Sequence, residues 1–317
     1  MEKRPLGGTG LDIAPIVFGG NVFGWTIDKA TSFDVLDAFV DHGFNAIDTA
    51  DVYSSWAPGN SGGESESIIG DWLAARPGMR DRVTIFTKVG SDMGAPERKG
   101  LSERWIAEAV EDSLRRLKVD AIDLYFSHWP DTDTPYAETL GAYAKLIDAG
   151  KIRAIGASNL DAAQLREALD VSRTGSLPGY QALQPEYNLF DRAAFDGALR
   201  DICVGDGIGV VTYYSLASGF LTGKYRSEAD LPKSARGDGV AKYLTPRGFA
   251  ILEALDDVAA RHGAKPAEVA LAWQIAREGV TAPIASATSV AQVESFSRAA
   301  ALKLSPEDIA ALDAASA

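Results

Sequence analysis

Four ionisable side chains follow short apolar runs in the first half of the sequence, and together they have the chemistry of a proton transfer. They are Asp48, Tyr53, Lys88 and His128. A buried lysine stays charged only beside an acid, and Asp48 is the obvious partner for Lys88. An ammonium favours the phenolate of a nearby tyrosine, so we expect Lys88 to lower the pKa of Tyr53 from about 10. Tyr53 is therefore the predicted proton donor.

Each of these residues alone also has a purely structural explanation. An Asp–Lys pair on neighbouring strands is often a simple ion pair, and a tyrosine in a loop often only packs. A single histidine is often a satisfied member of a core. The functional interpretation therefore depends on all four side chains meeting at one place, and this depends on the elements that carry them.

Eight apolar runs alternate with stretches of helical spacing, and each run ends in a polar residue or a glycine before a loop. The runs cover residues 15–18, 44–47, 83–86, 122–126, 152–155, 182–183, 208–211 and 282–284. This alternation predicts a (β/α)8 TIM barrel, an α/β fold whose catalytic residues gather at the C-terminal ends of the strands. Neighbouring barrel strands lie about 4.8 Å apart, so the four side chains should converge on one mouth.

The remaining segments divide into a hairpin, helices and two long loops. Residues 4–13, with a glycine-rich turn, predict a β-hairpin that could plug the N-terminal end of the barrel. The expected helices cover 31–42, 65–75, 102–117, 135–149, 161–170, 191–203, 246–262, 266–277 and 289–300, with a last one capped by Ser305. Thr31 or Ser32 should cap the first helix. The stretches 54–64 and 218–243 should be long irregular loops at the C-terminal face.

Composition bounds the domain organisation and the partners. The chain has 317 residues, 46% of them hydrophobic, and we expect residues 1–317 to form one domain. A net charge of −13 disfavours a nucleic acid or an anionic membrane as partner. No apolar run approaches the roughly 20 residues of a transmembrane helix, the N-terminus lacks the apolar core of a signal peptide, and Cys203 is the only cysteine. These features predict a cytoplasmic protein, either a monomer or a small homo-oligomer.

At five places, in order, the sequence resembles the aldo-keto reductase family. The segments are FNAIDTADVY at 44–53, DLYFSHWPD at 123–131, GASN at 156–159, QPEYN at 184–188 and YYSLASGFLTGKY at 213–225. The resemblance runs almost from end to end of the chain. It implies a (β/α)8 barrel that binds a nicotinamide dinucleotide without a Rossmann fold, and no G-x-G-x-x-G sequence follows an apolar run here.

The resemblance implies a role for each of the four rim residues. Tyr53 would protonate the carbonyl oxygen, and Lys88, paired with Asp48, would lower the pKa of that tyrosine. His128 would orient the carbonyl. Hydride would pass between C4 of the nicotinamide and the carbonyl carbon of an aldehyde, ketone or sugar. The residues implied near the nicotinamide are Ser158, Asn159 and Gln184 at its carboxamide, Tyr213 under its ring, and Gly20, Asn21 and Val22 near its ribose.

The rest of the cofactor site departs from the family pattern. The resemblance implies further contacts from Ser215, Leu216, Ser218, Lys224, Ser286, Thr288, Ser289 and Gln292. Relatives often have Lys or Arg where this chain has Ser286, Ser289 and Gln292. At these positions this chain therefore lacks basic side chains that could bind a 2′-phosphate. The N-terminus of the following helix can still receive a phosphate through its backbone N–H groups, and basic residues at 224–236 and 298 lie within reach. The resemblance favours NADP(H), with NAD(H) as the alternative.

Three tryptophans, Trp25, Trp56 and Trp129, are placed to wall a substrate pocket for a small carbonyl compound, and an aromatic wall favours apolar or sugar-like faces. Two other functions stay open. Some members of the resembled family are regulatory subunits that bind the dinucleotide and a partner protein. Alternatively, Lys88 is placed where a barrel lyase holds a Schiff-base amine. The predicted site contains no metal ligand.

Overall fold

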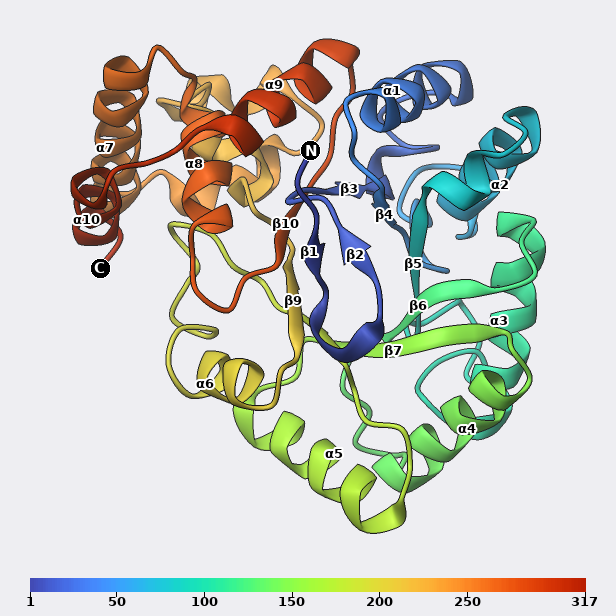
Figure 1. Ribbon diagram of the computed structural model, residues 1–317. Coiled ribbons are helices and arrows are strands. Elements are labelled where there is room, and N and C mark those ends of the chain that lie inside the picture. The colour runs from blue at the N-terminus through green and yellow to red at the C-terminus, as the bar shows by residue number, and fades with distance from the viewer.

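Eight parallel strands close into a barrel in the computed structural model, which describes residues 1–317 apart from the side chain of residue 238. Around the barrel they follow the order β10–β3–β4–β5–β6–β7–β8–β9. They are β3 (Val17–Gly19), β4 (Ala46–Asp48), β5 (Thr84–Val89), β6 (Ile122–Ser127), β7 (Ile152–Ser158), β8 (Ala182–Gln184), β9 (Gly209–Thr212) and β10 (Ala282–Ala285). Each predicted run contributes one strand, so the predicted (β/α)8 fold is confirmed (Figure 1).

Helices surround the barrel and follow each strand (Figure 1). They are α1 (Lys29–Asp41), α2 (Glu64–Ala75), α3 (Glu103–Leu117), α4 (Tyr136–Asp148), α5 (Ala162–Gly175), α6 (Ala198–Gly205), α7 (Pro246–His262), α8 (Pro266–Ile275), α9 (Val290–Ala301) and α10 (Pro306–Ala315). Helix α10 begins at its predicted cap, where the Ser305 hydroxyl accepts a hydrogen bond from the Asp308 amide at 3.2 Å. Along the described chain, no helix is both long and apolar enough to cross a membrane.

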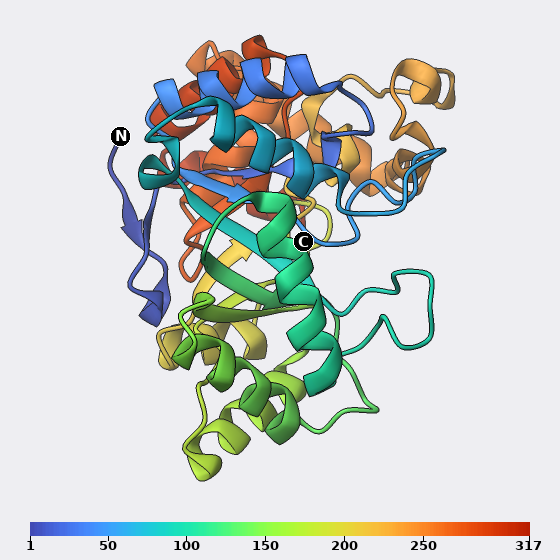
Figure 2. The ribbon, with the colours of Figure 1, turned by 90° about the vertical axis from the view of Figure 1, so that its right-hand side faces the viewer.

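The N-terminal hairpin covers the end of the barrel where the strands begin, as predicted (Figure 2). Its strands, β1 (Arg4–Pro5) and β2 (Asp12–Ile13), pair antiparallel on either side of the short 3-10 helix η1 (Gly7–Thr9). Gly7 has a φ of +52°, and a Cβ atom there would lie 2.2 Å from the Gly209 nitrogen at the start of β9. Only glycine fits this approach, so the turn can sit directly against the barrel.

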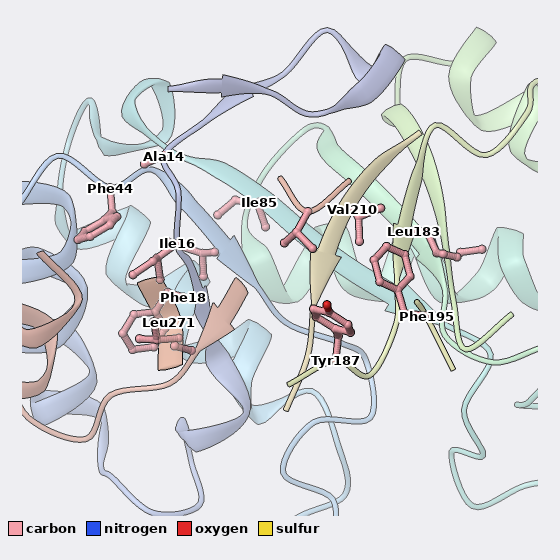
Figure 3. Close-up of a cluster of buried hydrophobic side chains, with 14 of the residues drawn as sticks. Ala14, Ile16, Phe18, Phe44, Ile85, Leu183, Tyr187, Phe195, Val210 and Leu271 are labelled. Carbon is pink, nitrogen blue, oxygen red and sulfur yellow. The ribbon is translucent and has the colours of Figure 1, made fainter. Parts of the chain in front are cut away.

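Two apolar layers enclose the strands. The barrel interior holds Leu6, Ile13, Val17, Ala46, Phe86, Leu124, Phe126, Ala154, Ala182, Val211, Ala282 and Ile284. The outer layer, between strands and helices, includes Ile16, Phe18, Phe44, Leu183 and Tyr187, which Figure 3 shows in close-up. The two layers alternate along each strand, as Val17 and Phe18 do in β3. Because the interior is packed with apolar side chains, the polar rim residues gather at the open C-terminal end.

The segment before α6 differs from the prediction. The predicted helix at 191–203 begins only at Ala198, because Gly197 has a φ of +96° and the chain before it turns. The Asn188 side-chain oxygen accepts hydrogen bonds from the amides of Phe190 and Asp191, which holds that turn. Asn188, a strong turn former, lies three residues before the expected start of the helix. It was the sign in the sequence that the helix begins later than its spacing predicts.

Three smaller expectations also need correction. Asp28 caps α1 by accepting a hydrogen bond from the Thr31 amide at 2.8 Å, so neither Thr31 nor Ser32 is the cap. Helix α5, expected to end at residue 170, continues to Gly175. The stretch 218–243 is only partly irregular, because three 3-10 helices lie along it, namely η4 (Ala217–Thr222), η5 (Glu228–Lys233) and η6 (Gly237–Tyr243).

Candidate active site

The C-terminal ends of β4, β5 and β6 bring the four predicted rim residues to one mouth. Asp48 is the last residue of β4, Lys88 is the penultimate residue of β5, and His128 directly follows β6. Tyr53 lies in the turn after β4. This mouth is at the end of the barrel away from the N-terminal hairpin, on the side of the long loops in Figure 2.

Lys88 joins the acid and the phenol. Its ammonium, which is fully buried, donates to Asp48 Oδ2 at 2.7 Å, to the backbone oxygen of Thr49 at 2.8 Å and to the Tyr53 hydroxyl oxygen at 2.8 Å. An ammonium has three protons, and each finds one oxygen here. Burial lowers the pKa of Lys88, while the adjacent Asp48 carboxylate opposes that shift. The lysine is therefore a fixed, fully bonded support for the Tyr53 oxygen.

The pKa of Tyr53 is shifted in the direction opposite to the sequence-based expectation. Burial of the phenol and the negative charge of Asp48 raise the pKa of Tyr53 well above 10. The Tyr53 hydroxyl also donates a long hydrogen bond of 3.3 Å to Asp48 Oδ2. The expected lowering by Lys88 is thus wrong, because burial of the phenol and the adjacent carboxylate both raise the pKa of Tyr53. Tyr53 holds its proton at neutral pH, as a general acid must before it reacts.

The backbone and ring of His128 are fixed from several sides. Its amide donates to the backbone oxygen of Val89 at 2.8 Å, and its carbonyl accepts a hydrogen bond from the Asn159 side chain at 2.9 Å. Its ring packs edge-on to Tyr53, with the centroids 6.0 Å apart. Burial, reinforced by the positive charge of Lys88, lowers the pKa of His128 well below 6.5, so the imidazole is neutral near pH 7.

Ser91, a residue that was not predicted from the sequence, completes the surroundings of His128. Its hydroxyl lies 3.0 Å from His128 Nδ1 and accepts a hydrogen bond of 3.1 Å from the Trp129 indole N–H. The indole of Trp129 also stacks on the His128 ring, with an interplanar angle of 12°. The sequence could not identify Ser91 as functional, since a serine three residues after a lysine matches no catalytic motif.

The residues predicted to contact the nicotinamide carboxamide lie directly beside the four rim residues. The Gln184 side-chain amide donates to Asp48 Oδ1 at 2.9 Å, and the Ser158 hydroxyl donates to the Gln184 backbone oxygen at 2.7 Å. Asn159 donates to the Ser158 hydroxyl oxygen at 3.2 Å and accepts from the Tyr213 hydroxyl at 2.7 Å. Strands β7, β8 and β9 thus bring these four side chains into one network with Asp48.

A group of aromatic rings surrounds the mouth and includes the three predicted pocket tryptophans. The Trp56 ring centroid lies 5.6 Å from that of Trp25 and 5.9 Å from that of Tyr53. Trp56 and Trp129 are 47% and 48% exposed, which is unusual for side chains of this size. Tyr214, next to Tyr213 and 49% exposed, joins them and was not predicted. The opening beside Tyr53 therefore presents uncovered aromatic surface.

The segments at the ends of β3 and β10 also meet. Gly20, Asn21 and Val22 form the short 3-10 helix η2 (Gly20–Val22) directly after β3. The Asn21 side-chain oxygen accepts hydrogen bonds from the Ser286 hydroxyl at 2.8 Å and from the Arg236 guanidinium at 3.2 Å. Arg236 comes from the stretch 218–243, so that stretch reaches across to the start of the first βα unit.

The other predicted cofactor residues lie further from the four rim residues or make contacts of their own. The Ser215 hydroxyl bonds to the Thr212 backbone oxygen and its carbonyl accepts from Gln274 of α8. The exposed Lys224 lies over the Tyr225 ring, Leu216 is half-buried against the outer core, and Ser218 is half-buried in η4.

At the start of α9, one of the backbone amides proposed for phosphate already has a partner. The Thr288 amide donates to Gln292 Oε1 at 2.7 Å, and Ser289 is the residue that precedes the helix. Arg298, the basic residue expected nearest this end, forms an ion pair of 2.7 Å with the buried Glu268 of α8. This end of the predicted cofactor site thus offers backbone N–H groups rather than an available cation.

A second buried charge cluster lies behind the site, between the barrel and the helices α2 and α3. Glu66 accepts hydrogen bonds from the Thr87 hydroxyl and from the Arg116 guanidinium, both at 2.6 Å. The Asp51 carboxyl is 1% exposed, and neither of its oxygens has a hydrogen-bond partner among the described residues. Burial and the nearby Glu66 raise the pKa of Asp51 well above 3.8. Nothing in the sequence around Asp51 marks this residue as buried.

Comparison with known proteins is consistent with this geometry. The model of the "Aldo/keto reductase family" matches residues 15–317. An uncharacterized oxidoreductase, YrpG of Bacillus subtilis, is 34% identical over 316 residues, which cover 97% of this chain and 93% of that protein. A probable voltage-gated potassium channel subunit beta of Arabidopsis thaliana is 33% identical over 305 residues, 93% of this chain and 89% of the relative. An uncharacterized 11.2 kDa protein of Pseudescherichia vulneris is 66% identical over 95 residues, 30% of this chain and 92% of that protein.

Proposed function

The chain belongs to the aldo/keto reductase family, and from that premise and the site geometry we propose that it is an NAD(P)H-dependent carbonyl reductase with Tyr53 as its general acid. Family membership supports oxidoreductase activity on carbonyl compounds. One observation carries the finer proposal: the Tyr53 hydroxyl oxygen lies 2.8 Å from a buried ammonium that Asp48 also binds, at the open mouth of a barrel. We further propose that residues 1–317 work as one domain.

The residues at the mouth fit a nicotinamide dinucleotide. Ser158, Asn159 and Gln184 offer hydroxyl and amide groups of the kind that pair with a carboxamide, and Tyr213 offers a flat ring beside them. Arg236 places a cation at the same mouth, where a diphosphate would need one. When bound, the dinucleotide would supply the hydride, which no protein side chain can provide.

The protein side chains would then supply a proton and orientation. Tyr53 would release its proton from the phenol oxygen to the carbonyl oxygen of the substrate, and its raised pKa keeps that proton available beforehand. The Lys88 ammonium, already bonded to the Tyr53 oxygen, would stabilise the phenolate that remains. The neutral His128 would donate a hydrogen bond to the carbonyl oxygen and fix its direction.

We propose NADP(H) as the first cofactor to test, with NAD(H) as the alternative. The support for NADP(H) is the resemblance to the family and not a basic side chain at the 2′-phosphate end of the site. There Arg298 pairs with Glu268, and the Ser286 hydroxyl bonds to Asn21. The substrate we propose is an uncharged aldehyde, ketone or sugar with an apolar or flat face. The exposed rings of Trp56 and Trp129 beside Tyr53 support that choice.

The decisive experiment is a panel assay of the purified protein with NADPH and with NADH against aldehydes, ketones and sugars. Oxidation of either dinucleotide that depends on a carbonyl substrate, and that Tyr53→Phe abolishes, would support the proposal. A protein that binds a dinucleotide but turns over no carbonyl in either direction would overturn it.

A regulatory subunit is the second candidate, because one relative is named a probable voltage-gated potassium channel subunit beta. Dinucleotide quenching of tryptophan fluorescence without carbonyl turnover would favour this function. A Schiff-base aldolase is the third. The three hydrogen bonds of the Lys88 ammonium weigh against it, since a nucleophilic amine must be free of protons and of such partners. Borohydride trapping of an adduct on Lys88 would favour it nonetheless.

A further inference from the structure

We propose that Ser91 is a positioning residue, which, together with Trp129, keeps the His128 proton on Nε2, the ring nitrogen left to meet a substrate. The inference rests on the proposed function, because it assigns the means by which His128 becomes a hydrogen-bond donor. It depends on three side chains that meet at the ends of β5 and β6. Their hydrogen bonds can be counted atom by atom.

The counting starts from the Trp129 indole, whose N–H can only donate. It donates to Ser91 Oγ at 3.1 Å and so uses one lone pair of that hydroxyl. The Ser91 hydroxyl has a single proton and lies 3.0 Å from His128 Nδ1. Within the described part of the chain, no other acceptor lies in hydrogen-bond range of that proton. The Ser91 proton therefore points to Nδ1, which must be the bare nitrogen.

The opposite tautomer would leave a group unsatisfied. If His128 held its proton on Nδ1, the Ser91 oxygen would receive two donors, and its own proton would have no acceptor. Ser91 is only 8% exposed, so water cannot readily supply the missing bond. His128 would then also present a lone pair, rather than an N–H, to an incoming carbonyl oxygen. The arrangement therefore selects the tautomer with hydrogen on Nε2.

The rest of the surroundings hold the ring so that the selected N–H has a fixed direction. Val89 and Asn159 bind the backbone of His128 on either side, and the stacked Trp129 indole holds the plane of the ring. Gly90, between β5 and Ser91, has a φ of +116°, and a Cβ atom there would lie 3.0 Å from Leu101. The turn that brings Ser91 to Nδ1 thus depends on glycine.

The first test reads the tautomer directly and needs no substrate. Nitrogen-15 NMR of the protein labelled at its three histidines, with His128 assigned by its loss in His128→Gln, distinguishes a protonated ring nitrogen from a bare one. We expect wild type to show the proton on Nε2. Ser91→Asp, which places an acceptor-only carboxylate beside Nδ1, should move a proton onto Nδ1. A wild-type protein with its proton on Nδ1 would overturn the inference.

The second test reads the reaction. Ser91→Ala should lower kcat/KM for the carbonyl substrate about 10- to 100-fold, by analogy with the hydrogen-bond partners that orient metal-bound histidines. The dinucleotide dissociation constant should stay unchanged, and Ser91→Thr, which keeps the hydroxyl, should restore most of the rate. Ser113→Ala, which removes another buried hydroxyl, from α3, serves as the matched control and should retain full activity. A Ser91→Ala enzyme as active as this control would overturn the inference.

The two tests fail separately. A wild type that reduces no carbonyl would remove the proposed function, yet the NMR experiment would still report which nitrogen of His128 holds the proton. Conversely, an active enzyme whose His128 is protonated on Nδ1 would keep the proposed function and remove only the role of Ser91.

Discussion

Arg236 donates a hydrogen bond of 3.2 Å to the side-chain oxygen of Asn21, a residue that precedes it by 215 positions. The bond connects the long segment after β9 to the turn after β3. The Arg236 guanidinium also lies over the Trp25 ring, 5.5 Å from its centroid. Burial lowers the pKa of Arg236, but a guanidinium stays charged at any working pH. Among the side chains that the structure describes, no carboxylate pairs with Arg236, so a fixed cation lies at the mouth.

We predict that Arg236→Gln weakens dinucleotide binding about tenfold while the fold stays intact. The reason is that a diphosphate would lose its nearest cation, and the affinity of the wild type should fall more steeply with salt than that of the variant. Isothermal titration calorimetry measures both effects. Arg226→Gln is the matched control, since Arg226 is in the same segment but pairs with Asp256. Equal affinities of wild type and Arg236→Gln would contradict the prediction.

Tyr53→Phe should reduce carbonyl turnover by about 10²- to 10⁴-fold, the range expected for loss of a general acid, with dinucleotide affinity retained. Because burial and Asp48 raise the pKa of Tyr53 above 10, the phenol is protonated throughout the neutral range. The rate of reduction by wild type should therefore stay level up to about pH 9 and fall only in more alkaline solution. Stopped-flow kinetics across pH test this. Tyr136→Phe, at the start of α4, is the control, and a decline of the wild-type rate centred near pH 7 would refute the assignment.

Because Lys88 and Asp48 form a buried ion pair, we predict that substitutions of the two residues have strongly non-additive effects on the free energy of unfolding. Lys88→Met leaves a carboxylate buried without its ion partner, and such a loss typically costs about 3–5 kcal/mol. The double variant Asp48→Asn/Lys88→Met removes both charges and should recover a large part of that loss. Urea unfolding of the two single variants and the double variant gives the coupling free energy. Additive losses in the double variant would show that the two side chains do not depend on each other.

The barrel and the four rim residues could be predicted because both depend on local sequence order. Each strand is a short apolar run, and parallel strands of a barrel must end at the same face, so Asp48, Lys88 and His128 had to approach one another. The pKa of Tyr53 could not be predicted, since it depends on how deeply the phenol is buried and on the balance between two opposite charges.

Ser91 was not predicted, and Arg236 was expected only as one of several basic residues at 224–236 that could reach the cofactor site. Each acts through a hydrogen bond to a residue far away in the sequence, Ser91 to His128 and Arg236 to Asn21. The identity of either side chain gives no hint of its partner until the turns of the chain are known. Loops carry much of the function of a barrel, and their conformations are the least determined by local pattern.

Gln184→Ala should raise the dissociation constant of the dinucleotide about tenfold. In the structure the Gln184 amide bonds to Asp48 Oδ1, so its loss also removes one hydrogen bond from the carboxylate that supports Lys88. We therefore expect kcat to fall as well, by a smaller factor than in Tyr53→Phe. Gln181→Ala is the matched control, because Gln181 precedes β8 at the opposite end of the barrel and its side chain donates a hydrogen bond to the backbone oxygen of Gly8 in the hairpin. An unchanged dissociation constant in Gln184→Ala would mean that the carboxamide contact is wrongly assigned.

The raised pKa of the Asp51 carboxyl leads to a prediction of how the stability of the protein depends on pH. Its pKa is raised in the folded state by burial and by Glu66, so the folded protein binds the Asp51 proton more tightly than the unfolded chain does. The stabilisation from this group is complete below the ordinary pKa of 3.8 and is lost as pH rises toward the folded value. Over that interval the free energy of unfolding should fall by up to about 1.4 kcal/mol per pH unit from Asp51 alone. Other carboxyl groups with lowered pKa values act in the opposite direction, so wild type alone cannot isolate this effect.

The variant Asp51→Asn isolates it, because the amide has nearly the shape of the protonated acid and does not titrate. We expect the difference in unfolding free energy between Asp51→Asn and wild type to move in favour of the variant as pH rises from 4 to 8. Urea unfolding at each pH measures this difference, and Asp201→Asn, at an exposed position on α6, should show no such trend. A difference that stays constant across this range would mean that Asp51 is ionised at pH 4 as readily as in the unfolded chain. In that case the buried carboxylate must draw its support from Arg116 or Lys88, the two cations that oppose the shift.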